Sequence, residues 1–307
     1  MVRADEKEAQ LYARFLDDYG TEREAMITFG IRGTKVVQID GEPAKRLGDF
    51  LGQFPSVCLS SRDFRLVRES PSDRRKWMDL VLSSSSPEYL RALQGYYRSM
   101  KERNTLLKKE AGDAEVAAFE HTLASSAHIL RQLRSSFFPS INEVFERSYT
   151  CLSNNLEKAG LSYLPDAHGE SVSEWVELFA RERHKDRLFG STRKGPHRDD
   201  FSLLLNNRDA RHYGSEGQQK GVVLALRLAE FSFLQQQLGT IPILLADDVL
   251  GELDASRRAN FRKLLSPHAQ TFSTGTSYPS EDEKEIWETF EVNEGSFIPL
   301  TSPVHND

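Results

Sequence analysis

ILLADDVLGELD, residues 243–254, runs from four apolar side chains straight into two adjacent aspartates. A short apolar run of this kind favours a strand covered on both faces in a parallel sheet. Ligands of such sheets lie beyond the carboxyl ends of the strands. This is the Walker B pattern, in which Asp247 holds Mg²⁺ and Asp248 orients or deprotonates the water that attacks a γ-phosphate. A strand-end turn with exposed aspartates is the alternative.

A second motif precedes this strand. YGSEGQQKG, residues 213–221, places Ser215 and Gly217 just before a long apolar helix. The N-terminus of a helix offers free backbone N–H groups and the positive end of a dipole, and glycine permits close approach of a ligand. The segment is therefore suited to a phosphate. A simple helix cap followed by a flexible loop is the alternative.

The composition excludes several classes of protein. The 307 residues are 28% charged and 38% apolar, with a net charge of −6, which is ordinary for a soluble protein. No apolar stretch approaches the length of a membrane span, and the charged N-terminus is not a secretory signal. Cys58 and Cys151 lie far apart and form no metal or disulfide pattern. We expect a cytoplasmic protein with no membrane partner.

One stretch is locally basic although the whole chain is acidic. RERHKDRLFGSTRKGPHR, residues 181–198, holds seven Lys or Arg against two acids. Such a run is suited to contact with phosphates. The alternative is a solvated helix face followed by a loop.

The first two thirds of the chain divide into two parts. Residues 1–83 hold short apolar or alternating runs, which predict an antiparallel meander, a further strand and then a helix that exposes Arg74 and Arg75. Residues 84–184 place apolar side chains three and four apart, which predicts long antiparallel helices forming an arm, with a break at Pro139.

Residues 185–307 return to a mixed pattern. A hairpin is expected with its turn at Asn206 and Asn207. A helix that is apolar on nearly all sides follows, ends at Gly239 and should be buried. The fold class that these parts predict is α/β, with one head split by an inserted antiparallel α-helical arm.

The order of the motifs narrows this fold class. A Ser-Gly-Gln loop on a helix, a Walker B strand and then GELD follow one another as in ABC-type ATPase heads. Together with four segments, they make the chain resemble the RecF family of bacterial DNA replication and repair proteins, which are related to SMC heads. The segments are SPSDRRKWMDL, KERNTLLK, GPHRDDFSLLLNNRDARHYGSEGQQKGVVLALRLAE and LLADDVLGELDASRR. The resemblance extends from Val2 to about Thr276.

The resemblance implies an ABC-ATPase-like head with a β-rich N-terminal part and a parallel-sheet α/β part, and with the helical arm as lobe II. It implies ATP and Mg²⁺ as cofactors and an ATP-dependent homodimer on DNA, at junctions between single strands and duplex. It also implies RecO and RecR as partners, in loading recombinase and in the SOS response.

Three groups of site residues follow from the resemblance. The catalytic pair is Asp247, which also holds the metal, and Asp248. The nucleotide-binding residues have three roles. A signature formed by Ser215, Gly217 and Gln218 reaches the γ-phosphate on the partner subunit. Asp254 is the D-loop aspartate, and Thr276 is the phosphate sensor. The candidates for contact with DNA phosphates are Lys194, Arg198, Arg208 and Arg211.

One motif does not occur within the 307 residues. A P-loop needs G-x-x-x-x-G-K-[ST], whereas GSTRKGPH, residues 190–197, has Pro196 and His197 where Lys and Ser or Thr belong. In RecF-like proteins the motif lies before the region that matches residue 1, so we expect an N-terminally shortened chain. An ATPase-inactive remnant that serves as an interaction module for DNA or protein is the alternative. An SMC-like head with a long coiled coil is disfavoured, because residues 84–184 are too few to form such a coiled coil.

Overall fold

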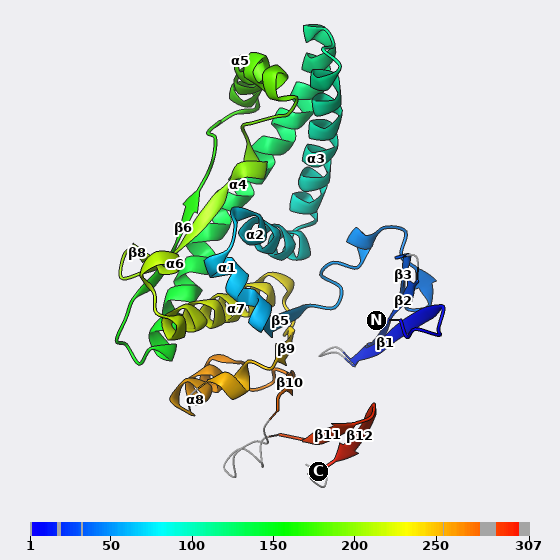
Figure 1. Cartoon of the computed structure of the whole chain (residues 1–307), viewed down its shortest axis with the longest axis vertical. Coiled ribbons are helices and arrows are strands. Elements are labelled where there is room, and N and C mark those ends of the chain that lie inside the picture. The colour runs from blue at the N-terminus through cyan, green and yellow to red at the C-terminus, as the bar shows by residue number, and fades with distance from the viewer. Residues whose placement is uncertain (1, 17–19, 32, 254, 277–286, 301–307) are drawn as a thin grey trace.

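The structure is a computed structural model that describes residues 2–16, 20–31, 33–253, 255–276 and 287–300. A helical arm rises above a long buried helix, and a short parallel sheet lies below that helix (Figure 1). An antiparallel sheet formed by the first strands lies to one side, near a C-terminal hairpin. The α/β class predicted from the sequence is confirmed.

The N-terminal sheet is the predicted antiparallel meander. Its strands pair in chain order and are β1 (Glu8–Leu16), β2 (Glu22–Gly30), β3 (Lys35–Ile39) and β4 (Glu42–Pro43). Asp40 and Gly41 form the tight turn between β3 and β4, both with positive φ. Two residues in this conformation are what the favoured two-residue hairpin turn requires. A separate hairpin closes the described chain, with strands β11 (Phe290–Asn293) and β12 (Ser296–Pro299).

The parallel sheet has the strand order β10-β9-β5. Its strands are β5 (Ser56–Ser60), β9 (Ile243–Asp247) and β10 (Thr271–Thr274). Alternate residues such as Val57 and Leu244 are buried, at 0% and 1% exposed. Leu245 and Phe272 point the other way and are 38% and 54% exposed. The sequence predicted that β9 is buried on both faces. This prediction is wrong for the part of the chain that the structure describes, because only one face of the sheet is covered there.

The arm contains three helices, α3 (Pro87–Lys108), α4 (Asp113–Leu152) and α5 (Val172–Phe189). The predicted break at Pro139 does not occur, because α4 is a single helix of 40 residues that contains Pro139. Proline removes one N–H and crowds the preceding turn. Phe138 and Ile141, on either side of it, are 5% and 0% exposed. Tertiary packing of these neighbours overrides the local preference for a break.

One strand lies among the helices of the arm. β6 (Ala159–Leu164) pairs antiparallel with β7 (Asp200–Leu205), which pairs with β8 (Arg208–Asp209). The periodicity of residues 84–184 indicates helix alone, because the partner of β6 lies some forty residues farther along the chain. The division into 1–83, 84–184 and 185–307 stays a prediction. The predicted hairpin turn is confirmed, with Asn206 and Asn207 both at positive φ.

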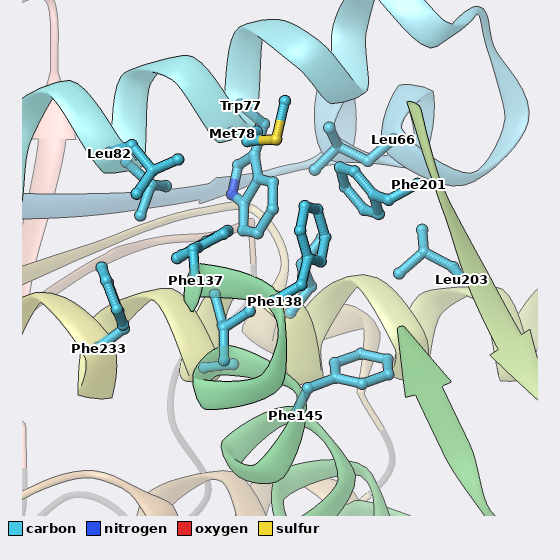
Figure 2. Packing of buried hydrophobic residues seen from close by; sticks show 14 of the residues in the cluster. Leu66, Trp77, Met78, Leu82, Phe137, Phe138, Phe145, Phe201, Leu203 and Phe233 are labelled. Atoms are coloured by element: carbon cyan, nitrogen blue, oxygen red, sulfur yellow. The ribbon is translucent and has the colours of Figure 1, made fainter. Parts of the chain in front are cut away.

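The long helix α7 (Glu216–Leu238) is the centre of the core, as predicted, and ends at Gly239 in the left-handed conformation. Val222, Ala225 and Leu226 are fully buried. Figure 2 shows Phe233 of α7 near Phe137 of α4, with Trp77 of α2 (Pro71–Ser85) above them. The ring centroids of Phe137 and Phe233 are 4.9 Å apart in an edge-on contact. Aromatic packing of this kind joins the arm to the head.

Buried ion pairs hold the same junction. Arg134 on α4 is 1% exposed and donates to Asp79 on α2 and to Asp199, just before β7. Arg74 forms a two-pronged contact with Asp200, at 2.7 and 2.8 Å. The expectation that Arg74 lies on an exposed face is therefore wrong, because its charge is balanced by a residue far along the chain. Among the described helices, none has the length and apolar character needed to cross a membrane.

Candidate functional site

The carboxyl ends of the parallel strands gather three oxygen-bearing side chains. The register places Ser60 of β5 and Thr274 of β10 on either side of Asp247, the last residue of β9. The hydroxyl of Thr274 donates to the Asp247 carboxylate at 2.8 Å. Asp247 is exposed, so one of its oxygens is positioned by a neighbour while the carboxylate as a whole faces outward.

Asp248 departs from the strand geometry. Its φ is +56°, a left-handed conformation that non-glycine residues adopt at a cost of about 1 kcal/mol or more. Two bonds from its backbone N–H hold this conformation, to the Thr274 carbonyl at 3.2 Å and the Thr274 hydroxyl at 3.1 Å. The two aspartates are thus presented differently, one at a strand end and one in the turn that follows.

The signature segment forms the predicted helix N-terminus. Ser215 caps α7, accepting from the backbone N–H of Gln218, whose side-chain oxygen accepts from the N–H of Ser215 at 2.7 Å. This reciprocal capping box fixes the first turn. The N–H groups of Glu216 and Gly217 lie in that turn, where helix geometry supplies no acceptor. The cap and the phosphate interpretations are therefore compatible.

Gly217 also contacts the helix that follows the Walker B strand. Arg257, in α8 (Ala255–Leu264), donates to the Gly217 carbonyl at 3.2 Å. A β-carbon at Gly217 would lie 3.5 Å from the same guanidinium. The side-chain amide of Gln218 donates a hydrogen bond to Glu157. Asp254 lies outside the described residues.

The signature helix also contacts the segment that follows β5. Arg227 of α7 donates to Asp63 at 2.6 Å, and the other oxygen of Asp63 accepts from the backbone N–H of Ser60 at 2.8 Å. Ser60 and Lys220, one turn beyond the signature, line the same small cavity of about 10 Å³. The strand ends and the signature helix therefore form one packed unit.

The strand ends offer oxygen ligands of the kind that Mg²⁺ prefers. Mg²⁺ usually takes one or two carboxylates, several waters and substrate phosphates. Asp247, with the hydroxyls of Ser60 and Thr274 beside it, matches that set. No cluster of three or more acidic, histidine or cysteine ligands occurs among the described residues. The carboxyl edge of the parallel sheet therefore does not resemble a metal site built from protein ligands alone.

The four candidates for DNA contact lie in two segments. Lys194 and Arg198 belong to the loop before β7, where Lys194 pairs with Asp166 at 3.3 Å and Arg198 is exposed. Arg208 and Arg211 are exposed and flank the N-terminal end of α6 (Ala210–Tyr213). Among the described residues, no hydrogen bond or ion pair links the two pairs, so their roles stay predictions.

Sequence reasoning missed several residues of this site. Thr274, two residues before the predicted sensor Thr276, is the threonine that contacts both aspartates. Thr276 is exposed beyond the end of β10. The strand register was needed to find Thr274, and the sensor role of Thr276 stays a prediction. Asp63 and Arg227 gave no local signal, because 164 residues separate them.

Comparison with known proteins gives relatives over most of the chain. A DNA replication and repair protein RecF from Caldanaerobacter subterraneus subsp. tengcongensis is 34% identical over 292 residues, covering 90% of this chain and 78% of the relative. Another, from Synechococcus sp. (strain JA-2-3B'a(2-13)), is 33% identical over 295 residues, covering 92% and 77%. The chain belongs to the RecF family of DNA replication and repair proteins.

Solved structures agree with membership of the RecF family. The recombination mediator protein RecF in complex with ATP, from the RecFOR pathway, matches with a TM-score of 0.85 and 27% identity, over 98% of this chain and 82% of that one. An SMC head bound to the C-terminal winged-helix domain of ScpA matches with a TM-score of 0.53 and 13% identity. The second likeness concerns the fold alone, and it agrees with the predicted α/β head. No family model matches the chain.

Proposed function

We propose that this RecF family chain acts in recombinational repair and replication as a DNA-binding ATPase head. The nucleotide phosphates lie at the carboxyl edge formed by Ser60, Asp247 and Thr274. The single observation that carries this proposal is the hydrogen-bonded group at that edge, in which one threonine bonds to the carboxylate of Asp247 and to the backbone N–H of Asp248. A matching RecF structure is described as a complex with ATP.

The two aspartates take different tasks in this proposal. Asp247 holds Mg²⁺, and the metal would neutralise phosphate charge as it develops. Asp248 accepts a hydrogen bond from the attacking water and orients it. Its left-handed backbone, held by Thr274, sets the direction of its carboxylate. Thr276 is a phosphate sensor at the next loop position.

The signature belongs to the partner's site. In the proposed ATP-dependent homodimer, Ser215, Gly217 and Gln218 meet the γ-phosphate held by the other subunit, and Asp254 lies at the interface. The first turn of α7 supports this task, because its capping box and Arg257 hold it in one conformation. Free N–H groups at such a turn attract an anion.

DNA, RecO and RecR are the proposed macromolecular partners, and the cytoplasm is the proposed location. Lys194, Arg198, Arg208 and Arg211 contact phosphates in this scheme. The matching RecF structures carry the name of the RecFOR pathway. The preferred DNA is a junction between single strand and duplex, as the family resemblance implies.

The dimer proposal is tested with a second protein that supplies the P-loop, since G-x-x-x-x-G-K-[ST] does not occur within the 307 residues. This chain and an intact RecF family member carry different fluorophores, and energy transfer reports their association. ATP with Mg²⁺ is expected to bring them together. Ser215→Arg is expected to abolish that association, because the arginine occupies the position of the phosphate.

The matched control is Ser140→Arg, the same change at an exposed serine of α4. Association that survives Ser215→Arg would contradict the role of the signature. A second measurement titrates a fluorescent ATP analogue into the purified chain with and without Mg²⁺. Asp247→Asn should remove any Mg²⁺-dependent binding, and Asp49→Asn should not. DNA binding without nucleotide binding or ATP-driven association would instead favour the interaction module.

A further inference from the structure

We propose that the hollow between the β7–β8 hairpin and the start of α7 binds one unpaired DNA base, stacked on Tyr213. This inference rests on the proposed DNA binding and names the form of DNA that this surface recognises. The hollow has a volume of about 370 Å³ and is lined by Leu205, Asn206, Arg208, Tyr213 and Gln218. That volume lies at the small end of the range for ligand sites, roughly 300–1,000 Å³.

Tyr213 presents an unusually open aromatic ring. Its side chain is 67% exposed, although it is the last residue of α6 and lies two residues before the cap of α7. Arg208 lies beside the ring, with its guanidinium carbon 5.6 Å from the ring centroid. An exposed aromatic ring with an arginine plane beside it is a stacking platform for nucleic-acid bases.

The surrounding backbone holds this platform rigidly. Asn206 and Asn207 form a tight turn with positive φ, and Asn206 exchanges hydrogen bonds with the backbone of Lys158 at 2.8 and 3.1 Å. Leu205, at the floor of the hollow, is 5% exposed. A preformed site of this kind loses little entropy when a base enters.

The charge around the hollow favours a polyanion. Arg208 lines the hollow and is exposed. Arg211, two residues before Tyr213, and Lys158, whose backbone bonds to Asn206, are exposed as well. Three carboxylates nearby bond to other groups: Asp209 accepts from the backbone N–H of Arg211, Glu157 accepts from Tyr149 and Gln218, and Glu216 pairs with Lys220. The positive side chains therefore remain available to the phosphates on either side of a stacked base.

Single-stranded DNA satisfies this geometry better than duplex. In a duplex both faces of a base are covered by its neighbours, so Tyr213 can reach only an unstacked base. Gaps and single-strand junctions supply such bases. The hollow therefore gives the chain a means to distinguish a junction from continuous duplex without reading sequence, because every base has an aromatic face.

The test uses the purified chain and a gapped duplex that carries 2-aminopurine at one unpaired position. Binding of the unmodified protein is expected to quench the fluorescence, because a stacked 2-aminopurine emits weakly. Tyr213→Ala should abolish the quench and weaken binding to gapped DNA roughly 5- to 150-fold, the usual contribution of one stacked base. Tyr213→Phe should retain both. Binding to a continuous duplex should change little in either variant.

Tyr12→Ala is the matched control, since Tyr12 is 60% exposed on β1, far along the chain from the hollow. The Tyr12→Ala variant should quench 2-aminopurine fluorescence and bind gapped DNA as the unmodified protein does. Thermal unfolding checks that Tyr213→Ala remains folded. Equal affinity and quench in Tyr213→Ala and the unmodified protein would overturn the inference while leaving the proposed DNA binding intact. Unaltered DNA binding with weaker binding of a fluorescent ATP analogue would assign the hollow to nucleotide instead. No DNA binding by the unmodified protein would overturn the proposed function itself.

Discussion

Arg227, on the helix that begins with the signature serine, donates a 2.6 Å hydrogen bond to Asp63, three residues beyond the end of β5. The same guanidinium donates to Glu230 at 2.6 Å, and Glu230 accepts from the indole of Trp77. One cation thus connects α7, the carboxyl edge of the parallel sheet and α2. Burial alone would lower the pKa of Arg227, but the two carboxylates beside it raise it above its usual value and keep the cation charged.

Replacing Arg227 is the first test of this connection. Arg227→Met leaves Asp63 and Glu230 without their cation, and both are less than 10% exposed. Removing one partner of a buried ion pair costs about 3–5 kcal/mol, so we expect a loss of about 3 kcal/mol in the free energy of unfolding. Urea denaturation followed by circular dichroism measures this loss.

Arg14→Met is the matched control. Arg14 pairs with Glu22 at 3.5 Å, and both side chains are 61% exposed. A solvated pair contributes at most about 1 kcal/mol. A similar loss of stability in the two variants would show that the Arg227 contact does not stabilise the head.

His197 makes stability depend on pH. It lies in η3 (Pro196–Arg198), bonds to the Tyr96 hydroxyl at 2.7 Å and to the Thr192 carbonyl at 3.0 Å, and is partly buried. Burial lowers its pKa from the ordinary 6.5 to about 4. Between these two values the unfolded chain binds more protons than the folded one, so stability falls as the pH drops through this window.

We expect this single group to contribute up to about 3 kcal/mol of the loss between pH 6.5 and 4. Urea unfolding at half-unit pH steps measures it. His197→Gln retains a side-chain hydrogen-bonding group but cannot be protonated, so its stability should decline less steeply over the same window. Parallel declines in the two proteins would mean that other groups govern the acid sensitivity.

Urea unfolding can also compare the contributions of Thr274 and Thr276 to stability. Thr274→Val removes a hydroxyl that bonds to Asp247 and to the backbone of Asp248, so we expect a loss of about 1 kcal/mol. Thr276→Val changes an exposed side chain and should stay within about 0.5 kcal/mol. The reverse order would show that the hydroxyl of Thr274 does not support the two aspartates.

Local patterns predicted the parts of this fold whose causes are local. The cap at Ser215, the end of α7 at Gly239 and the Asn206–Asn207 turn depend on residues within one turn of each other, and all three are confirmed. The order of the signature, Walker B and GELD motifs also predicted the RecF family. These are features in which propensity and chemistry act over a few neighbouring residues.

The errors occur where distant residues decide the outcome. Pro139 stays within a helix because Phe138 and Ile141 are buried against other elements. Arg74 is buried because Asp200, 126 residues away, balances its charge. Thr274 was missed because only the register of β9 and β10 places it beside Asp247. None of these partners can be read from a window of the sequence.

The arm offers a final test of long-range ion pairs. Arg103 on α3 is 0% exposed and bonds to Glu120 on α4, to Asp186 on α5 and to the Phe179 carbonyl. Its cation therefore joins all three helices of the arm. Arg103→Met would leave two buried carboxylates without this partner, so we expect a loss of about 3–5 kcal/mol and faster amide hydrogen exchange along α5.

Lys101→Met, an exposed change two residues earlier on the same helix, should leave hydrogen exchange unchanged. Mass spectrometry of peptides from α5 and α7 locates the effect. Exchange that rises in α5 and not in α7 would identify the arm as a unit that opens by itself, because the hydrogen bonds of Arg103 join α3, α4 and α5. Equal rises in both helices would mean instead that arm and head unfold together, and that the contacts of Arg134 and Phe137 across their junction are strong enough to couple them.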